Sequence, residues 1–554
     1  MKNTSVKKFL ACLLATTCFT GLLAGCGNEK SKVNSTEQTK QSTEQVQQSS
    51  ESTAPVEEET GVTYPLEEEV TLTFAMQERA AVVANYETMG DAPFMQAWQE
   101  ATGVKLEVTQ YSGNEGMNLL FASGELPDIV FITSSSAYPG GMAKAIEDGA
   151  VMPITDYMEY APDFAAVLES NEIYRKSNTT PNGEIIGFPF IRGDEYLLTS
   201  YGLQVRQDFL DAVDMEVPST PDELYDVLKA FKEELKLEAP WSSKSGDILT
   251  HGLGGGLLTT PFGLPKSDPY VEDGIVHMGY YEKEYKDVLV WLNKLYEEGL
   301  LDPNFTVKPD TRANFMNGVS GVTMDTVGSG IGTFLNTMKD DPTFDVTGFG
   351  PLVAKEGDVP MSTHYDNPFA GHYAVITPAC KNIEAAMKFL NYGYTEAGSM
   401  LFNFGIEGES YEMIDGYPTY TDYIMNNPEG LTVANAMAPF VPAAVVGGPF
   451  VQDKRYMEQY SGLPQQQAAL TQWTNSDAAK YKIPATTIPS EDLAEYSKIK
   501  GDIGTYVSEM TVKYISGLED LETFETVYLD TLKTMGVERL RELEQKAYDE
   551  FMAR

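Results

Sequence analysis

The sequence predicts an α/β fold built around a parallel sheet, and three observations support this prediction. Apolar residues alternate with polar or small ones over 70–76, which is the period of a half-buried strand. Strand-like and helix-like stretches then follow one another through residue 132, which is the order that a parallel sheet requires. The run over 128–132 is almost entirely apolar, as in a strand buried on both faces.

Residues 1–25 have the pattern of a secretion signal. Three lysines precede an apolar stretch over 9–24, which is short for a membrane-spanning helix. The stretch ends in Leu-Ala-Gly-Cys at 23–26, which resembles the lipobox of bacterial lipoproteins. The resemblance implies cleavage before Cys26 and attachment of a palmitate-bearing diacylglycerol to its thiol. The alternative is an ordinary signal peptide that a cysteine follows by chance.

Residues 26–69 predict a disordered tether between this anchor and the folded body. Ser, Thr, Gln and Glu dominate the segment, and aromatic residues are nearly absent. Such a composition cannot bury enough apolar surface to offset the entropy lost on ordering. The folded body is therefore expected to span 70–554.

Helices and strands of the body are indicated by apolar spacing and by end signals. After the first strand, a helix over 92–101 ends at Gly103, and strand alternation resumes over 104–108. A short helix begins at Asn114 and stops near Gly124. These elements complete the strand–helix alternation that leads to the buried strand.

Three later helices are also expected. The capping box Thr-Pro-Asp-Glu at 220–223 starts a helix in which apolar residues recur at helical spacing as far as Leu235. The same spacing recurs over 288–295, and Gly299 is placed to end that helix. The stretch over 538–551 is again amphipathic.

The net charge limits the classes of partner. The formal charge of −43 comes from 39 Lys and Arg against 82 Asp and Glu in 554 residues. A body this acidic is repelled by nucleic-acid phosphates and by anionic bilayers, so we expect no nucleic acid and a membrane contact through the Cys26 lipid only. The length and the 42% apolar content suit more than one domain or lobe.

Catalytic and metal-binding motifs are absent or weak. No P-loop, H-E-x-x-H or C-x-x-C pattern occurs, and the glycine-rich 252–256 has the wrong flanks for a dinucleotide site. The four histidines are scattered, which favours structural roles over zinc binding. We therefore expect no enzyme activity, no cofactor and no metal. Cys380, the one cysteine after Cys26, lies in an apolar run and is expected to be buried and unpaired.

Short segments spread over the body carry a family resemblance. They are FASGELPDI at 121–129, NGEIIGFP at 182–189, VRQDFL at 205–210, LYEEGLLDP at 295–303, FGIEGE at 404–409, YISG at 514–517 and KAYD at 546–549. In this order they resemble segments of the family 1 extracellular solute-binding proteins, in their lipoprotein branch. That branch supplies the substrate-binding components of carbohydrate ABC transporters.

The resemblance implies a two-lobed, periplasmic-binding-protein-like fold of type II with a ligand cleft between the lobes. We place the first lobe at about 70–190 and 370–440, and the second at about 191–369 and 441–554. The resemblance further implies capture of a carbohydrate, by family habit an oligosaccharide, and its delivery to the permease subunits of an ABC importer. The protein would act as a lipid-anchored monomer on the outer face of the cytoplasmic membrane.

One feature of some relatives is missing. Relatives that bind uronate oligosaccharides carry an EF-hand-like calcium loop after the helix that matches 222–235. Here 236–241 reads KLEAPW, without the D-x-[DN]-x-[DN]-G pattern, so we do not expect calcium.

Candidate ligand contacts come from strand ends and from tryptophans outside helix stripes. Ligands of open α/β sheets bind beyond the carboxyl ends of strands, and Arg and Asp give planar, charge-assisted hydrogen bonds to hydroxyl groups. Trp241 and Trp473 lie in polar surroundings and are predicted stacking platforms, unlike Trp98 and Trp291, which lie on helix stripes. The predicted ligand-binding residues are Gln77, Arg79, Tyr111, Asn114, Ser135, Arg192, Arg206, Trp241, Asp325, Tyr365, Asp366 and Trp473.

Four functions stay open at this stage. The first is an oligosaccharide-binding protein of an importer, and the second is the same fold binding a peptide or another solute. The third is a surface glycan-active enzyme, either a glycosidase or a lyase, and the fourth is a sensor or adhesin that transports nothing. The ordered segments favour the first.

Overall fold

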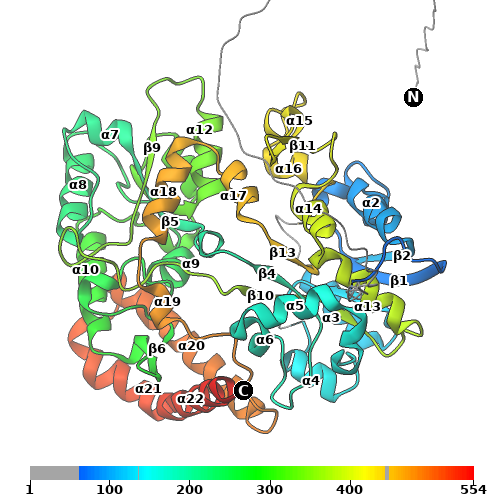
Figure 1. Cartoon of the computed structure of the whole chain (residues 1–554). Helices are drawn as coiled ribbons and strands as arrows, with labels where there is room; N and C mark the ends of the chain where they lie inside the picture. The colour runs from blue at the N-terminus through cyan, green and yellow to red at the C-terminus, as the bar shows by residue number, and fades with distance from the viewer. Residues whose placement is uncertain (1–60, 135–136, 443–447) are drawn as a thin grey trace, which may run out of the picture. The chain divides into compact units, whose positions relative to one another are not determined.

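The computed structural model describes residues 61–134, 137–442 and 448–554 (Figure 1). The predicted signal peptide and the predicted anchor residue Cys26 lie outside the described residues, and so does Ser135. Among the described residues, none of the helices combines the length and the apolar character that crossing a membrane requires.

The end of the predicted tether lies against the body. Tyr64 Oη donates a hydrogen bond to Lys388 O at 2.6 Å, and Leu66 N donates to Thr102 O at 2.9 Å. The Tyr64 ring also meets the edge of Tyr392, with centroids 5.1 Å apart. These two hydrogen bonds and the ring contact hold Tyr64 and Leu66 against the body, although the polar composition of 26–69 predicts a tether.

A six-stranded sheet organises the first lobe, with strand order β13-β4-β10-β3-β1-β2. Its strands are β1 (Val70–Gln77), β2 (Val104–Tyr111), β3 (Ile129–Ile132), β4 (Phe188–Arg192), β10 (Phe369–Ile376) and β13 (Phe450–Gln452). Strand β1 is parallel to β2 and β3, as predicted. Strand β10 is antiparallel to β3 and β4, so the prediction of a parallel sheet is wrong at this strand. Strand β13 pairs with β4, so the first-lobe sheet includes residues that follow the predicted end of this lobe at about 440.

Helices cover both faces of this sheet. On one face Trp98 of α2 stacks on Phe389 of α13, with ring centroids 4.0 Å apart, so Trp98 is a core residue as predicted. On the other face, Met117 of α3 and Ile146 of α4 form a second cluster. The first-lobe helices are α1 (Ala80–Val83), α2 (Pro93–Thr102), α3 (Gly113–Ser123), α4 (Gly141–Glu147), α5 (Pro162–Ser170), α6 (Glu172–Ser177), α13 (Ile383–Asn391), α14 (Glu396–Phe404), α15 (Asp422–Met425), α16 (Val433–Met437) and α17 (Lys454–Tyr460), and the hairpin is β11 (Tyr411–Ile414) with β12 (Tyr417–Tyr420).

The second lobe is built on a three-stranded antiparallel sheet of order β8-β5-β9. The strands are β5 (Tyr201–Arg206), β8 (Val322–Thr326) and β9 (Val346–Phe349), with a hairpin of β6 (Pro269–Glu272) and β7 (Ile275–Met278). The helices are α7 (Gln207–Ala212), α8 (Pro221–Glu233), α9 (Ser245–Asp247), α10 (Glu284–Glu297), α11 (Thr311–Met316), α12 (Thr333–Thr337), α18 (Pro464–Thr474), α19 (Ala478–Tyr481), α20 (Leu493–Ile515), α21 (Asp530–Met535) and α22 (Val537–Ala553). The predicted capping box is present at the start of α8, where Thr220 caps and Glu223 reaches back.

The chain passes between the two sheets three times, after β4, after β9 and after β13. Figure 1 shows β4, β10 and β13 running in the region between the two groups of helices. The single cysteine of the described chain, Cys380, is buried behind β10, and burial raises the pKa of its thiol to about 11.

Helix α18 and strand β5 make a close contact that yields a stability prediction. A β-carbon at Gly202 would lie 2.2 Å from Cε2 of Trp473, so Gly202→Ala cannot be accommodated without displacing the tryptophan. We expect a loss of about 1–3 kcal/mol in the free energy of unfolding, measured by urea denaturation. Gly246→Ala is the control, because nothing lies within 4 Å of that position. Equal stability of the two variants would contradict this packing.

Candidate functional site

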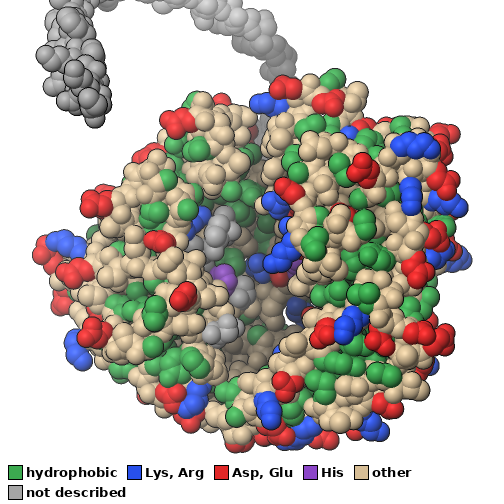
Figure 2. Space-filling view, turned by 180° about the vertical axis from the view of Figure 1, so that it is seen from behind, with side chains coloured by type: hydrophobic (Ala, Val, Ile, Leu, Met, Phe, Trp, Pro, Cys, Tyr) green, Lys and Arg blue, Asp and Glu red, His purple; other side chains and the backbone are tan. Residues whose placement is uncertain are grey.

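Two cavities lie between the lobes. The larger, of about 890 Å³, is lined by Arg312 and Gly328 of the second lobe and by Asn427 and Thr432 of the first. Tyr460 of α17 lines it where the chain crosses between lobes. Figure 2 shows a hollow between the two halves of the described body, with a histidine and several lysine or arginine side chains on its walls.

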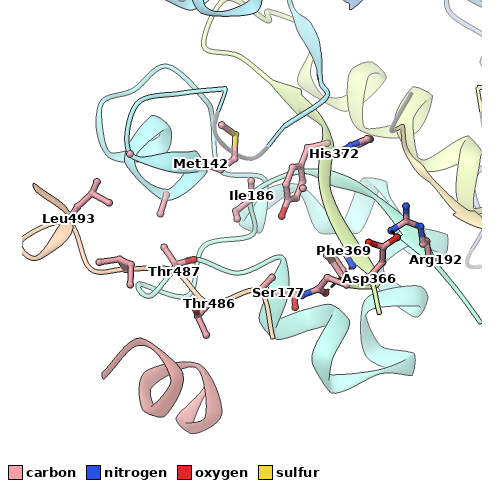
Figure 3. A pocket seen from close by; sticks show the side chains of 18 residues that line it. Met142, Ser177, Ile186, Arg192, Asp366, Phe369, His372, Thr486, Thr487 and Leu493 are labelled. Carbon is pink, nitrogen blue, oxygen red and sulfur yellow. Dashed lines mark hydrogen bonds and ion pairs between the residues drawn. The ribbon is translucent and has the colours of Figure 1, made fainter. Parts of the chain in front are cut away.

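The smaller cavity has a volume of about 600 Å³. Arg192 and Asp366 line it on one side, and Thr486 and Thr487 of the segment before α20 line it on the other. Figure 3 shows Ser177 between these two walls. The cavity is therefore shared by the first lobe, a crossing segment and the chain leading into α20.

A series of polar and aromatic side chains lies between the two cavities, and we call it the polar track. It consists of Arg312, Asp325, Tyr201, His251, His364, Asp366 and Arg192. Arg312 lines the larger cavity, and Asp366 and Arg192 line the smaller one. The polar track thus joins a residue that lines the larger cavity to residues that line the smaller one.

The first half of the polar track belongs to the second lobe. Arg312 binds Asp325 through two hydrogen bonds, Nε to Oδ2 at 2.6 Å and Nη2 to Oδ1 at 2.9 Å. Tyr201 pairs across strands with Thr326, the neighbour of Asp325, and donates through Oη to Met324 O at 3.0 Å. The Tyr201 ring stacks on His251, with centroids 3.7 Å apart. The strands β5 and β8 therefore place an ion pair and an aromatic stack side by side.

The second half joins the crossing segments. The Nδ1 atoms of His251 and His364 lie 3.2 Å apart, and His364 Nε2 lies 3.5 Å from Asp366 Oδ1. Asp366 Oδ2 pairs with Arg192 Nη1 at 3.1 Å. Burial and the neighbouring His364 lower the pKa of His251 to about 4. Burial alone would raise the pKa of Asp366, but the His364 hydrogen bond and the Arg192 charge lower it to about 2.

Several predicted site residues are brought together here. Arg192, Asp325 and Asp366 belong to the polar track, and Tyr365 O accepts a hydrogen bond from Lys482 Nζ at 2.6 Å beside it. Gln77 and Arg79 lie at the carboxyl end of β1. Gln77 Oε1 accepts from Thr133 Oγ1 at 3.0 Å, and Arg79 Nη1 donates to Ala438 O and Val441 O, each at 3.2 Å. Burial lowers the pKa of Arg79 to about 10.

Other predicted residues are placed in structural roles or on the surface. Tyr111 is buried and donates to Phe131 O, and Asn114 is exposed on α3. Arg206 is buried between the rings of Phe209 and Phe344, at 4.0 and 4.2 Å, and pairs with Asp208 at 2.6 Å. These contacts occupy the guanidinium of Arg206. Whether any predicted residue touches a ligand stays a prediction.

The expected exposure of Trp241 and Trp473 is wrong, because both side chains are 0% exposed. Trp241 packs in the second-lobe core against Trp291, with centroids 6.2 Å apart. Trp473 covers β5 and donates through Nε1 to Phe349 O at 2.8 Å. The polar residues around Trp473 predict an exposed side chain. They lie on the outer face of α18, however, while Trp473 faces the sheet.

Four members of the polar track were missed by sequence reasoning: Tyr201, His251, Arg312 and His364. The two histidines are far apart along the chain, and neither belongs to a recognisable motif. Only the fold brings them together. In the described part of the chain, no group of three or more His, Cys, Asp or Glu side chains is arranged to hold a metal ion.

Comparison with known proteins gives a family and relatives. The family described as bacterial extracellular solute-binding protein matches residues 88–400. Lipoprotein LipO of Bacillus subtilis (strain 168) is 27% identical over 378 residues, covering 66% of this chain and 72% of LipO. The fructooligosaccharide ABC transporter substrate-binding protein FusA of Streptococcus pneumoniae is 23% identical over 491 residues, covering 83% of this chain and 87% of FusA.

Solved structures agree with the fold. The alginate-binding protein AlgQ2 has a TM-score of 0.68 at 24% identity, covering 88% of this chain and 99% of AlgQ2. FusA in complex with kestose has a TM-score of 0.67 at 21% identity, covering 87% of this chain and 99% of FusA. The likeness confirms the two-lobed α/β fold predicted from the sequence.

The burial of His251 predicts a pH dependence of stability. Its pKa falls from 6.5 to about 4 on folding, so the folded state binds fewer protons between these values. The stability that this group contributes is complete above pH 6.5 and is lost as the pH falls towards about 4. We expect His251→Gln to lose less stability than wild type over this range, measured by chemical denaturation at a series of pH values. His277→Gln is the control, and identical pH profiles of wild type and His251→Gln would contradict the prediction.

Proposed function

Because the chain belongs to the bacterial extracellular solute-binding protein family, we propose that it captures an oligosaccharide between its lobes and delivers it to an ABC importer. The observation that carries this proposal is the polar track with a cavity at each end. A site that has two cavities suits a ligand of several units better than a single small molecule.

The chemistry of the site suits hydroxyl groups. The ion pairs Arg312–Asp325 and Arg192–Asp366 offer donors and acceptors in fixed planes, as vicinal hydroxyls require. Tyr460 adds an aromatic ring at the larger cavity, where apolar sugar faces can stack. Each ion pair balances its own charge, and Lys482 adds a positive charge beside the Arg192–Asp366 pair.

The relatives support the same ligand class. FusA is named for fructooligosaccharide transport, and AlgQ2 is named for alginate binding. A further structural neighbour, from Streptococcus pneumoniae, is named for N-glycan transport, with a TM-score of 0.56. These names describe binding proteins of importers rather than enzymes, and we propose that this protein likewise binds its ligand without converting it.

Lobe closure is the proposed mode of capture. Three segments connect the lobes, and the ligand would contact both lobes across the cavities. Contact with both lobes stabilises a closed arrangement relative to an open one. Closure would also exclude water, which strengthens the hydrogen bonds of the two ion pairs with the sugar.

Glycan binding is the first test. Calorimetry with fructooligosaccharides, alginate oligosaccharides, N-glycans and a peptide panel should show binding of at least one glycan series. Arg192→Ala should then weaken binding roughly tenfold to a hundredfold, because it removes a charged donor from the site and takes the guanidinium partner from Asp366. Arg539→Ala, which breaks a surface ion pair on α22, is the matched control and should bind like wild type. Binding of peptides alone would contradict the proposal.

Lipid anchoring is a second part of the proposal. It rests on the Leu-Ala-Gly-Cys sequence at 23–26 and on the relative that is named a lipoprotein. The anchored protein would lie on the outer face of the cytoplasmic membrane, as a monomer, next to its permease.

Replacing Cys26 by Ala tests the anchor. The Cys26→Ala protein should move from the membrane fraction to the medium, because the lipid-bearing thiol is lost. The measurement is fractionation of cells followed by detection of the protein. A variant that stays with membranes as wild type does would rule out this anchor.

A further inference from the structure

Two histidines that are far apart in the sequence meet in the middle of the polar track. Nδ1 of His251 lies 3.2 Å from Nδ1 of His364, although 113 positions separate the two residues. His251 lies in a helical turn of the second lobe (Ile248–Leu253), and His364 lies in the crossing segment between β9 and β10. Both residues are half-buried, and the His364 side chain remains 20% exposed. The two imidazoles therefore retain access to solvent.

The distance between the two nitrogens suits one metal ion. Imidazole nitrogens bind zinc at about 2.0–2.1 Å, so two of them at tetrahedral angles lie roughly 3.3 Å apart. The observed distance of 3.2 Å agrees with this spacing. A hydrogen bond between two neutral imidazoles has a similar length, so the other contacts of the pair have to distinguish the two arrangements.

The second ring nitrogen of His364 has the partner that metal-binding histidines commonly have. Nε2 of His364 lies 3.5 Å from Oδ1 of Asp366. A proton on Nε2 faces this carboxylate and leaves Nδ1 with a free lone pair beside His251. Histidines that bind metals typically donate their other nitrogen to a carboxylate or a carbonyl, which fixes the ring and makes the binding nitrogen more basic. Arg192 holds Asp366 in turn, at 3.1 Å.

Both imidazoles are fixed by their surroundings. The ring of His251 stacks on Tyr201, with centroids 3.7 Å apart. The glycine-rich run that follows His251 packs closely on the crossing segment before His364, since a β-carbon at Gly256 would lie 2.7 Å from Cβ of Ser362. Because the pair is already in place, an ion that binds there has little ordering to impose on the protein.

The charges around the pair indicate which ions it selects. Of the carboxylates that act on His251, Asp325 is bound by Arg312 and Asp366 by Arg192. Calcium and magnesium need several oxygen ligands, so we do not expect them here. Zinc, nickel and copper accept imidazole nitrogen, and copper binds such sites most tightly. Water has to complete the coordination, because no third His, Cys, Asp or Glu of the described chain joins the pair.

We propose that Nδ1 of His251 and Nδ1 of His364 together bind one divalent transition-metal ion, with Asp366 as the outer partner of His364. The ion ties a turn of the second lobe to a crossing segment. Sequence reasoning predicted no metal, because the histidines are scattered along the chain. The inference goes beyond the proposed function and does not depend on glycan binding.

Metal titration of the full chain, without a histidine tag, tests the pair. After EDTA treatment and removal of the chelator, calorimetry with copper, nickel and zinc chlorides should show one ion per chain, bound most tightly for copper. His251→Gln and His364→Gln should each weaken binding by roughly tenfold or more, because one of two ligands is lost. Asp366→Asn should weaken it by about tenfold through the loss of the outer carboxylate. His277→Gln is the matched control, since His277 contacts Glu282 and lies outside the polar track.

Copper spectroscopy gives a measurement on wild type, which does not depend on the folding of a variant. Pulsed electron paramagnetic resonance of the one-to-one copper complex should show two imidazole ligands, identified by their remote ring nitrogens. The His277→Gln complex should give the same spectrum, and the His364→Gln complex should show one imidazole. A crystal soaked with zinc should place the ion at about 2.0–2.1 Å from both Nδ1 atoms.

Three results would overturn the metal site. The first is a wild type that binds none of the three metals, which would leave the pair as a hydrogen bond between neutral imidazoles. The second is equal binding by wild type, His251→Gln and His364→Gln. The third is a copper spectrum without imidazole ligands, as cysteine thiolates elsewhere in the chain would give. None of these results affects the glycan titrations, which test the proposed function separately.

Discussion

The contact between Arg192 and Asp366 is the constraint on which the candidate site depends. Arg192 ends β4, and Asp366 lies just before β10, so the ion pair at 3.1 Å ties one crossing segment to another. Two backbone hydrogen bonds strengthen the tie, from Arg192 N to Pro368 O at 3.0 Å and from Asp366 N to Leu198 O at 2.7 Å. The same two side chains therefore join two crossing segments and also line the smaller cavity.

This contact follows from the position of β10, which the periodicity of the sequence does not reveal. Because β10 runs antiparallel between β3 and β4, its first residue Phe369 lies beside Ile191, and the chain before it meets the end of β4. Strand periodicity reveals that a strand exists but not its direction or its neighbours. The apolar run over 374–379 predicts a strand-like segment. Its position between β3 and β4 depends on pairing with residues that are far away in the sequence. Pairing between strands that are distant in the sequence cannot be predicted from the local pattern of a single sequence.

Local signals predicted much of the fold and part of the candidate site. Alternation and capping were sufficient for β1, β2, α2 and α8, because these patterns are set within a few residues. Arg192 was predicted because strand ends mark a cleft in such folds, and Asp325 and Asp366 were predicted because they are polar breaks near the expected crossings between lobes. Trp473 was misjudged because its burial depends on which face of α18 meets the sheet, and Trp241 because its segment pairs with Leu301 and Val322, which are distant in the sequence. The histidines were missed because they come together only once β5 and the crossing segment between β9 and β10 are adjacent.

The solitary Cys380 makes this protein suitable for site-selective fluorescent labelling. Its thiol is buried and its pKa is raised to about 11, so it offers little thiolate to alkylating dyes at neutral pH. A protein that begins after the anchor could therefore be labelled selectively at introduced surface cysteines. Lys339 and Asn427 line the larger cavity from opposite lobes and are natural positions for a donor and an acceptor dye. The distance between two such dyes would then report lobe movement in real time, without modification of the sugar.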